Sequence, residues 1–592
     1  MNELRTPADR LAALRREMTR RGLDGYLVPS GDDHASEYAG EHFGCRAWLS
    51  GFTGSAGTVA VTAESAGLWT DGRYFLQAEA QLAGSGIDLY RMGEPGVPTL
   101  GGWLAQHLPP EGVLGFDGRV LPARAADRLA EQLAEGQTLD GGHDLVGDIW
   151  EGRPALSCAP VWEQPAALAG RTRAEKLTDL RREMAELGAD RLVLPALDDV
   201  AWLLNLRGGD VACSPVALAF AAVEPERAVL FVQPEALRPE LCAALAADGV
   251  ELAPYGGVYG YVEGLPEGAA LWLDPEQASH ALWSRVPAHV LLLDEPSPVQ
   301  AAKAVKNPAE QEGMRRAHRK DGAALCRFLY WLKGAVGREK ITERSAAARL
   351  ETLRSEQPGY LGPSFETIAG YGPHGAIVHY AATPESDAAL QSRGLLLLDS
   401  GGQYAEGTTD VTRTVALGEL TAEERAMFTL VLRCHLALGG AKFRRGVTGH
   451  GLDAIARAPM WAEGLDYNHG TGHGVGCLLN VHEGPVRVGW RGPTVEFEPG
   501  MVTSNEPGFY KAGAFGVRTE NLMLCRAAEG DFLEFEPLTL APIDLDAIDP
   551  AALSAREKAQ LNAYHARVYR ELAPLLPADE AAWLAKATRA VE

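Results

Sequence analysis

The chain has 592 residues, of which 79 are acidic and 55 are basic, and its formal net charge is −24. This length exceeds what one hydrophobic core supports and predicts three or more domains. The acidic balance argues against nucleic-acid binding, which needs clustered Lys and Arg, and is compatible with divalent cations and positively charged peptide N-termini.

The first segment, up to Leu23, has the pattern of an amphipathic helix, with Leu11, Leu14 and Met18 at helical spacing. It lacks the uninterrupted apolar region and the cleavage site of a signal peptide, so we expect none. No apolar run approaches the ~20 residues that span a bilayer, so no membrane association is expected. The eight cysteines are scattered without a CxxC pair, which favours reduced thiols in a cytoplasmic protein.

An internal repeat occupies the first half of the chain. Residues 14–33 read LRREMTRRGLDGYLVPSGDD and align collinearly with residues 180–199, LRREMAELGADRLVLPALDD. Further on, AWLSGFTG at 47–54 corresponds to AWLLNLRG at 201–208. We infer a duplicated α/β unit, in which each copy opens with a helix, a strand and a turn.

The second copy ends near the acidic, proline-containing segment 291–300, and a new helix is predicted after it. Asn307 suits the N-cap of this helix, and Pro308 suits its first turn. Two later helices are predicted by capping boxes, Thr421 with Glu424 and Ser554 with Glu557. The first of these helices should close near residues 439–440.

The region that follows the helix starting at Asn307 carries carboxylates on short apolar segments. Residues 395–398 predict a buried strand followed by Asp399, and Asp410 lies at the start of a second strand. A hairpin with glycines at its turn would bring both aspartates into one pocket. Glu506 ends a further strand before a Pro-Gly pair.

A fourth carboxylate, Glu520, lies inside the segment FGVRTENLMLC, which is predicted to be a single strand over 515–525. Arg518 and Leu522 would share one face of this strand, because side chains alternate between faces. Taken alone, Glu520 next to Arg518 would be a surface ion pair. The other carboxylates of the same domain favour a shared site.

The segment YNHGTGHGVG at 467–476 places His469 and His473 among glycines. These residues alone allow a metal site, a phosphate-binding loop or a flexible turn, although no Lys-Ser/Thr follows in P-loop fashion. Buried carboxylates near each other must be neutralised, and two divalent ions about 3.5–4 Å apart form a recurring hydrolytic arrangement. Oxygen-rich ligation with one imidazole favours Mn²⁺, while cobalt, iron and zinc stay open.

The ordered motifs in this part of the chain resemble those of the pita-bread metallopeptidases. The motifs are Asp399-Ser-Gly, Thr409-Asp410, His469-Gly-Thr-Gly-His473, Asn505-Glu506-Pro-Gly and Arg518-x-Glu520-Asn. Three further segments and the doubled N-terminal region are similar to the three-domain, cytosolic form of Xaa-Pro aminopeptidase: RAWLSGFTGSAGTVAV at 46–61, LWTDGRYFLQA at 68–78 and GPHGAIVHY at 372–380. The resemblance covers essentially the whole chain.

This resemblance implies a fold of the α/β (α+β) class in three domains. Two tandem creatinase-like α/β domains would occupy residues 1–155 and 156–303, the second being a repeat of the first. A C-terminal pita-bread catalytic domain with a helical extension would occupy residues 304–592. The resemblance also implies a homodimer.

The resemblance further implies that two Mn²⁺ ions are held by Asp399, Asp410, His473, Glu506 and Glu520. Asp410 and Glu520 would bridge the ions, Asp399 would serve one of them, and His473 with Glu506 would serve the other. A hydroxide between the ions would attack the first carbonyl of a peptide whose second residue is proline. The free α-amine of the peptide would bind next to Asp399.

Further residues match positions that act on the peptide in the family. His482 would stabilise the oxyanion or pass a proton to the leaving proline nitrogen, and His379 would position the peptide backbone. By the same resemblance, Glu506 would be catalytic as well as a metal ligand, and His473 would contact the peptide. Arg73, in the first domain, would reach the peptide, either from the partner subunit or within its own.

Two positions next to the implied ligands, His469 and Asn505, are not expected to bind metal. His469 is not a ligand in the family and is expected behind the ligands. Asn505 replaces an aspartate that family members often carry, which should change only the charge next to Glu506.

Three alternatives use the same fold. A proline dipeptidase would need a pocket restricted to dipeptides. A creatinase-like amidinohydrolase needs no metal, and a non-catalytic peptide- or histone-binding relative would have lost its ligands. The five intact ligands argue against the last two.

Overall fold

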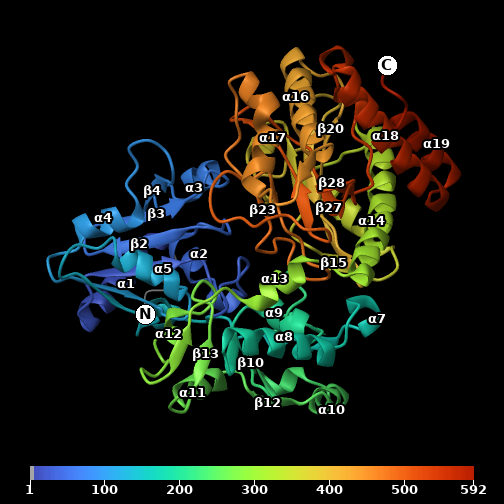
Figure 1. The fold of residues 1–592 in the computed structure, drawn as a ribbon. Coiled ribbons are helices and arrows are strands. Elements are labelled where there is room, and N and C mark those ends of the chain that lie inside the picture. Colours follow the sequence, from blue (N-terminus) through green and yellow to red (C-terminus); the bar gives the residue numbers. More distant parts are fainter. Residues whose placement is uncertain (1–5) are drawn as a thin grey trace. The chain divides into compact units, whose positions relative to one another are not determined.

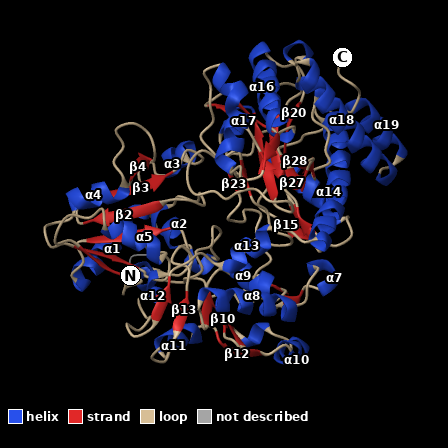
Figure 2. Ribbon diagram, viewed as in Figure 1, coloured by secondary structure: helices blue, strands red, loops and turns tan. Residues whose placement is uncertain are grey.

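The computed structural model describes residues 6–592, and Figures 1 and 2 show it as a ribbon. The chain forms two compact units. Unit 1 runs up to Pro165 and from Arg171 to Gln300, and unit 2 comprises Ala166–Gly170 and Ala301–Glu592. Among the described residues, every helix is too short or too polar to cross a membrane.

Unit 1 contains two six-stranded sheets with the same strand order. The first has the order β4 (Asp88–Arg91), β3 (Ala66–Thr70), β2 (Thr58–Thr62), β1 (Gly25–Pro29), β5 (Val113–Phe116), β6 (Thr138–Asp140). The second has the order β12 (Val250–Pro254), β11 (Ala228–Val232), β10 (Ala219–Val223), β8 (Arg191–Leu194), β13 (Ala270–Trp272), β14 (Leu291–Leu293). In both, the central strand pairs antiparallel on one side and parallel on the other. The fold therefore contains the repeat that the sequence predicts.

The first helix of each copy begins and ends in the same way. Both α1 (Pro7–Arg21) and α8 (Arg173–Leu187) start at a threonine capping box and end at a glycine in the left-handed conformation. The amphipathic pattern is confirmed for α1, whose Leu11, Leu14 and Met18 are buried. The part of that predicted helix before Thr6 lies outside the described residues.

Shorter elements complete unit 1. The helices are α2 (Cys45–Ser50), α3 (Phe75–Gln81), α4 (Leu100–His107), α5 (Ala123–Ala130), α6 (Leu145–Ile149), α9 (Leu197–Leu203), α10 (Pro239–Ala247), α11 (Gly257–Glu263) and α12 (His280–Trp283). The strands β7 (Trp162–Glu163) and β9 (Leu206–Arg207) pair antiparallel. Along the chain, α13 (Pro298–Ala304) spans the change from unit 1 to unit 2.

The paired aspartates of the repeat lie inside unit 1. Asp33, from the first copy, accepts hydrogen bonds from Tyr259 Oη at 2.7 Å and Ser279 Oγ at 3.0 Å. Its equivalent Asp199 accepts one from Ser297 Oγ at 2.6 Å. Burial raises the pKa of Asp33 to about 7, although both hydroxyl donors oppose the rise. The equivalent aspartates of both copies thus bind polar groups of the second copy, Asp33 from a loop and Asp199 from α9.

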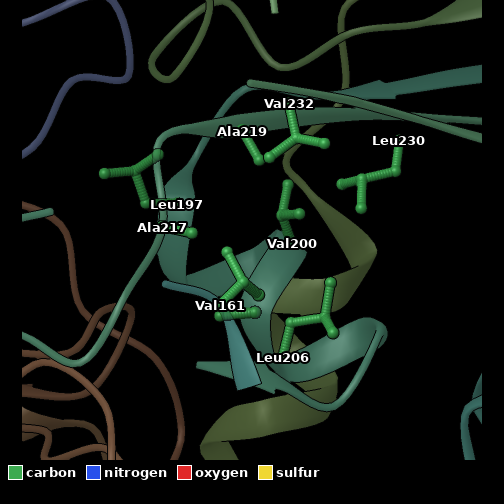
Figure 3. A pocket seen from close by; sticks show the side chains of 9 residues that line it. Val161, Leu197, Val200, Leu206, Ala217, Ala219, Leu230 and Val232 are labelled. Carbon is green, nitrogen blue, oxygen red and sulfur yellow. The ribbon is translucent and has the colours of Figure 1, made fainter. Parts of the chain in front are cut away.

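A small pocket in the second copy is lined entirely by apolar side chains (Figure 3). They come from α9, β10, β11 and the segments beside them, and include Leu197, Val200 and Leu230. The lining offers no side chain that could bind a cation or transfer a proton. We assign this pocket no role in catalysis.

Unit 2 is built around two main sheets. One has the order β16 (Ile368–Tyr371), β17 (Leu395–Ser400), β20 (Val411–Ala416), and the other has the order β21 (Lys442–Arg444), β28 (Phe532–Pro537), β27 (Asn521–Ala527), β24 (Val502–Asn505). The smaller sheets are β15 (Tyr360–Pro363), β18 (Gly402–Tyr404) and β19 (Gly407–Thr408); β22 (Gly472–His473) with β23 (Arg487–Val488); and β25 (Gly508–Lys511) with β26 (Phe515–Arg518).

The helices of unit 2 are α7 (Ala166–Ala169), α14 (Pro308–Ala335), α15 (Glu343–Ser355), α16 (Ala422–Gly439), α17 (Gly449–Ala462), α18 (Ala555–Leu572) and α19 (Ala578–Ala587). The sequence-based start of α14, with Asn307 as N-cap and Pro308 in the first turn, is confirmed. Both later capping boxes are also confirmed, and α16 ends at Gly439 as predicted.

In unit 2, the sheet formed by β16, β17 and β20 is buried on both faces. Leu396 and Leu398 of β17 pack with α14 and α15, whereas Leu395 packs with α16. Figure 1 shows β20, β27 and β28 between α16 and α17 on one side and α14 and α18 on the other. A strand buried on both faces has an uninterrupted apolar sequence, which explains the run of four leucines in β17.

Two local predictions need correction. Glu520 is not inside one strand, because the chain leaves β26 at Arg518 and starts β27 at Asn521. The strand β26 pairs with β25, whereas β27 pairs with β24 and β28. The connection between β17 and β20 is also not a simple turn, since β18 and β19 intervene and join another sheet.

Candidate metal centre

All five predicted metal ligands lie in unit 2, at or next to strand ends. Asp399 is within β17, and Asp410 directly precedes β20. His473 ends β22. Glu506 follows β24, and Glu520 lies between β26 and β27. Because β17 and β20 are paired, with Asp399 opposite Thr412, the two aspartates belong to neighbouring strands.

The distances define a compact group of ligand atoms. One ligand atom from each of Asp410, His473 and Glu520 lies within 4.8 Å of the others. His473 Nε2 is 3.5 Å from Asp410 Oδ2 and 3.4 Å from Glu506 Oε1. These separations fit side chains that share a cation between them.

The fifth predicted ligand, Asp399, is held by an arginine. Arg518 Nη2 donates to Asp399 Oδ2 at 2.6 Å, and both side chains are buried. Arg518 also donates to Tyr510 Oη at 2.8 Å and to Thr412 Oγ1 at 3.2 Å. The hydroxyl of Thr412 in turn donates to Glu520 Oε2 at 2.8 Å.

The two remaining oxygens of these carboxylates have no protein partner. Asp399 Oδ1 and Glu520 Oε1 are buried and accept no hydrogen bond among the described residues. An isolated buried carboxylate oxygen is costly unless a cation or a donor neutralises it. The residues present therefore fit divalent cations, which favour carboxylate oxygens with one imidazole.

Burial and mutual repulsion disturb the protonation of the acidic group. Burial raises the pKa of Asp399, while Arg518 lowers it. Burial and then the charges of Asp410 and Asp399 raise the pKa of Glu520 well above its ordinary value. Burial likewise raises the pKa of Glu506, and His473 opposes that rise. Without a cation, burial and the neighbouring charges thus favour the protonated carboxyl groups, and a bound cation would favour their ionised form.

The orientation of His473 suits a ligand. Its Nδ1 lies 2.8 Å from the carbonyl oxygen of Gly474, so Nδ1 carries the proton and Nε2 faces the carboxylates. Burial disfavours the imidazolium, yet the hydrogen bond to Asp410 and the charge of Glu506 raise the pKa of His473 to about 9. A cation at Nε2 would replace that extra proton.

The glycines around His473 allow close backbone approach. A Cβ on Gly472 would lie 2.1 Å from the carbonyl oxygen of Ser504, and one on Gly474 would lie 2.2 Å from that of Glu483. At these distances a Cβ atom would clash with the backbone oxygen, so both positions require glycine. The glycine-rich segment is therefore a tightly packed part of the site.

The other predicted site residues of unit 2 are His482, His379 and His469, and each has its own contacts near the five candidate ligands. The rings of His482 and His473 meet edge to face with centroids 4.2 Å apart. His379 follows Val378, whose carbonyl oxygen accepts from Arg518 at 3.3 Å. His469 Nε2 lies 2.8 Å from Tyr510 Oη, which in turn accepts a hydrogen bond from Arg518.

Arg73 belongs to unit 1, whereas the five candidate metal ligands belong to unit 2. Its guanidinium donates to both carboxylate oxygens of Asp71, at 2.9 and 2.8 Å, and lies 3.8 Å from Glu37. The side chain is thus fixed in one orientation within its own unit.

Asn505 is fully buried next to Glu506. Its Nδ2 donates to the backbone carbonyl of His435 at 2.9 Å, a bond that an aspartate could not donate.

Three side chains that organise the centre were assigned no role by the sequence. They are Arg518, Thr412 and Tyr510, which connect Asp399, Glu520 and His469. The motif Arg518-x-Glu520 was the available signal, but the arginine pairs with Asp399 and not with Glu520.

Comparisons with known families match successive parts of the chain. The description Creatinase/Prolidase N-terminal domain matches residues 10–147 and again residues 152–310. Metallopeptidase family M24 matches residues 312–527, and the C-terminal region of peptidase M24 matches residues 531–591.

Similar proteins match over almost the full length. Aminopeptidase P2 of Arabidopsis thaliana is 41% identical, over 98% of this chain and 88% of the relative. A probable Xaa-Pro aminopeptidase P of Talaromyces marneffei is 40% identical, over 98% and 92%. The crystal structure of an X-prolyl aminopeptidase from Caenorhabditis elegans, described as a cytosolic enzyme with a dinuclear active site, has a TM-score of 0.95 and 36% identity, over 99% and 100%.

Proposed function

This chain belongs to the aminopeptidase P group of metallopeptidase family M24, and we propose that it is a metal-dependent Xaa-Pro aminopeptidase. It removes the first residue from peptides whose second residue is proline. The observation that carries this function is the convergence of Asp410, His473 and Glu520 within 4.8 Å, with Glu506 beside His473.

The scissile bond of such a peptide has unusual chemistry. A bond to proline is a tertiary amide without an N–H, and the ring fixes φ near −65°. A protease that grips that N–H cannot hold the substrate. Recognition must use the free α-amine and the shape of the ring, which suits a site that holds cations beside carboxylates.

We propose that Asp399, Asp410, His473, Glu506 and Glu520 hold two divalent cations, Mn²⁺ being the best match to an oxygen-rich set. When bound, such a pair lowers the pKa of water and polarises a carbonyl group. Asp399, fixed by Arg518, would face the peptide α-amine.

The side chains around the ligands have separate tasks in this proposal. His482, whose ring contacts that of His473, would donate a hydrogen bond to the developing oxyanion or a proton to the leaving nitrogen. His379 would orient the peptide backbone. Glu506, which accepts from Ser504 Oγ at 3.2 Å, would hold the proton taken from the attacking water.

Purified protein should be incubated with Mn²⁺ and offered Arg-Pro-Pro, Ala-Pro, Met-Ala-Ser and creatine. We expect release of arginine from the tripeptide, and loss of that activity with a chelator or with Asp410→Ala. Cleavage of Ala-Pro alone would favour a proline dipeptidase. If the protein cleaves none of the peptides and retains no metal, the non-catalytic peptide-binding alternative is correct.

We further propose that the protein is a cytoplasmic homodimer in which Arg73 reaches the peptide. The worm relative is described as cytosolic, and all eight cysteines are free thiols in the structure. Exposed Trp461 and Trp490 in unit 2 offer apolar contact area for a second copy. For the domain boundaries, we retain 1–155, 156–303 and 304–592 as proposals. Sedimentation of the purified protein tests the dimer.

A further inference from the structure

A buried ion pair outside the metal centre joins two segments of unit 2. Lys306 Nζ lies 2.5 Å from Glu483 Oε1, and each side chain is only 2% exposed. Two charges withdrawn this far from water are costly unless they pair, and removing one partner leaves the other buried and unpaired. Neither residue is among the metal ligands or the peptide-facing side chains proposed above.

Lys306 is held in place by its own backbone. It lies between α13 and the N-cap of α14, six residues into unit 2 along the chain after Gln300. Its N–H donates to Gly500 O at 3.0 Å, and its carbonyl accepts from Gln311 at 2.7 Å. The neighbouring Val305 bridges Met501, just before the strand that leads to Glu506. These backbone contacts hold Lys306 in place within unit 2.

Glu483 is the residue after His482. Its N–H donates to Gly474 O at 2.9 Å, and the N–H of Gly474 donates to Val486 O at 2.8 Å. These bonds tie the loop that carries His482 to the strand that carries His473. The carboxylate of Glu483 also lies against Gly476, where a Cβ would approach Oε2 to 2.8 Å.

We propose that Lys306 and Glu483 are positioning residues that fix His482 against His473, and so set the peptide-facing side of the metal centre. The inference rests on the proposed function. A loop tied only by backbone bonds can shift by fractions of an ångström, whereas the ion pair anchors it to a rigid point. A displacement of about 1 Å at a catalytic group can cost 10²-fold in rate.

The test compares Lys306→Met, Glu483→Gln, Lys306→Arg and His482→Ala, each assayed on Arg-Pro-Pro with Mn²⁺. We expect Lys306→Met and Glu483→Gln to lower kcat/KM by about 10- to 100-fold with bound metal unchanged. Lys306→Arg keeps the charge and should recover most of the activity. In the His482→Ala background, adding Lys306→Met should cause no further loss, because the lysine acts through that histidine.

Three results of the activity and metal assays would overturn the inference: wild-type activity in Lys306→Met, metal loss in proportion to activity, or losses that multiply with His482→Ala. A second readout does not depend on turnover. Carbethoxylation of His482, followed by peptide mass spectrometry of the metal-loaded protein, should be several-fold faster in Lys306→Met, while the exposed His289 reacts at an unchanged rate. If wild type cleaves no Xaa-Pro peptide, the proposed function fails, and an unchanged His482 rate separately refutes the positioning role.

Discussion

Arg518 Nη2 donates to Asp399 Oδ2 at 2.6 Å, and this contact joins a strand of the β25–β26 pair to the central strand of a different sheet. The arginine is 1% exposed and the aspartate 7%. The pair leaves Asp399 Oδ1 as the oxygen available for a cation. A guanidinium thus selects which carboxylate oxygen faces the metal centre.

Replacing Arg518 by glutamine should weaken the centre without removing any ligand. Loss of this donor frees the Asp399 carboxylate to rotate, and partners of this kind typically contribute 10- to 100-fold in metal affinity or activity. Metal titration and kcat/KM on Arg-Pro-Pro measure both effects. Arg526→Gln, at a half-exposed arginine on β27, is the control and should change neither quantity. Unaltered metal affinity in Arg518→Gln would refute this role.

Glu520→Gln should stabilise the metal-free protein and abolish stabilisation by metal. Without cations, burial and the charges of Asp410 and Asp399 disfavour the ionised Glu520, whose pKa is raised well above its ordinary value. A neutral amide removes that cost, so the free energy of unfolding in chelator should rise by about 1–3 kcal/mol. Thermal unfolding with and without Mn²⁺ provides the measurement. Exposed Glu529→Gln serves as control. A variant less stable than wild type in chelator would contradict the prediction.

The buried Asp33 should make unit 1 less stable as the pH rises from about 4 to 7. Its pKa in the folded chain is about 7, against about 3.9 in an unfolded chain, so the folded state binds the extra proton over this window. Stability is then full below the unfolded value and declines as pH rises through the folded one, by about 4 kcal/mol at most. Denaturant unfolding across this range should give a flatter profile for Asp33→Asn.

The control for Asp33 is Asp88→Asn, at an exposed position of β4 in the same unit, and it should retain the wild-type pH profile. Tyr259 and Ser279 can still donate to the carbonyl oxygen of an asparagine, so the variant should fold. Identical slopes for Asp33→Asn and wild type would show that another group causes the dependence.

Arg73→Gln should raise KM for Xaa-Pro peptides by about tenfold or more while the bound metal stays unchanged, because a charge-assisted hydrogen bond contributes about 1.5–3 kcal/mol. The ligands lie in unit 2 and the arginine in unit 1, so the two effects separate. An unchanged KM would show that Arg73 does not touch the peptide.

Mixing subunits tests where Arg73 acts. Arg73→Gln keeps its own metal ligands, and Asp410→Ala keeps its own arginine. If the arginine serves the partner's site, co-refolding the two variants restores part of the activity, since each mixed dimer has one complete site. If it serves its own site, the mixture gains nothing beyond the activity of Arg73→Gln.

The five candidate ligands could be singled out from the sequence because each lies next to its own turn or strand signal, whereas their joint role as ligands was implied by the family resemblance. The partner of Arg518 could not, since its contact with Asp399 depends on which sheets adjoin. The break at Glu520 was missed for a related reason. Residues on both sides of it are apolar and buried, so alternation does not reveal that the chain changes pairing from β25 to β24.

The repeat was readable because its two copies retained the same motifs in the same order, and the strand orders agree accordingly. The sequence did not reveal that Asp33 of one copy binds Tyr259 and Ser279 of the other. Such a contact requires knowledge of how the copies pack. The repeated motif singles out Asp33 in the sequence, but its hydrogen-bond partners are known only from the tertiary structure.

The ligands are dispersed along unit 2, from the strand of Asp399 to the connection that holds Glu520. A nascent polypeptide therefore offers an incoming cation no more than isolated carboxylates until the ribosome has passed Glu520. If these five residues hold the cations, as proposed, metal loading is a late event in the maturation of this protein.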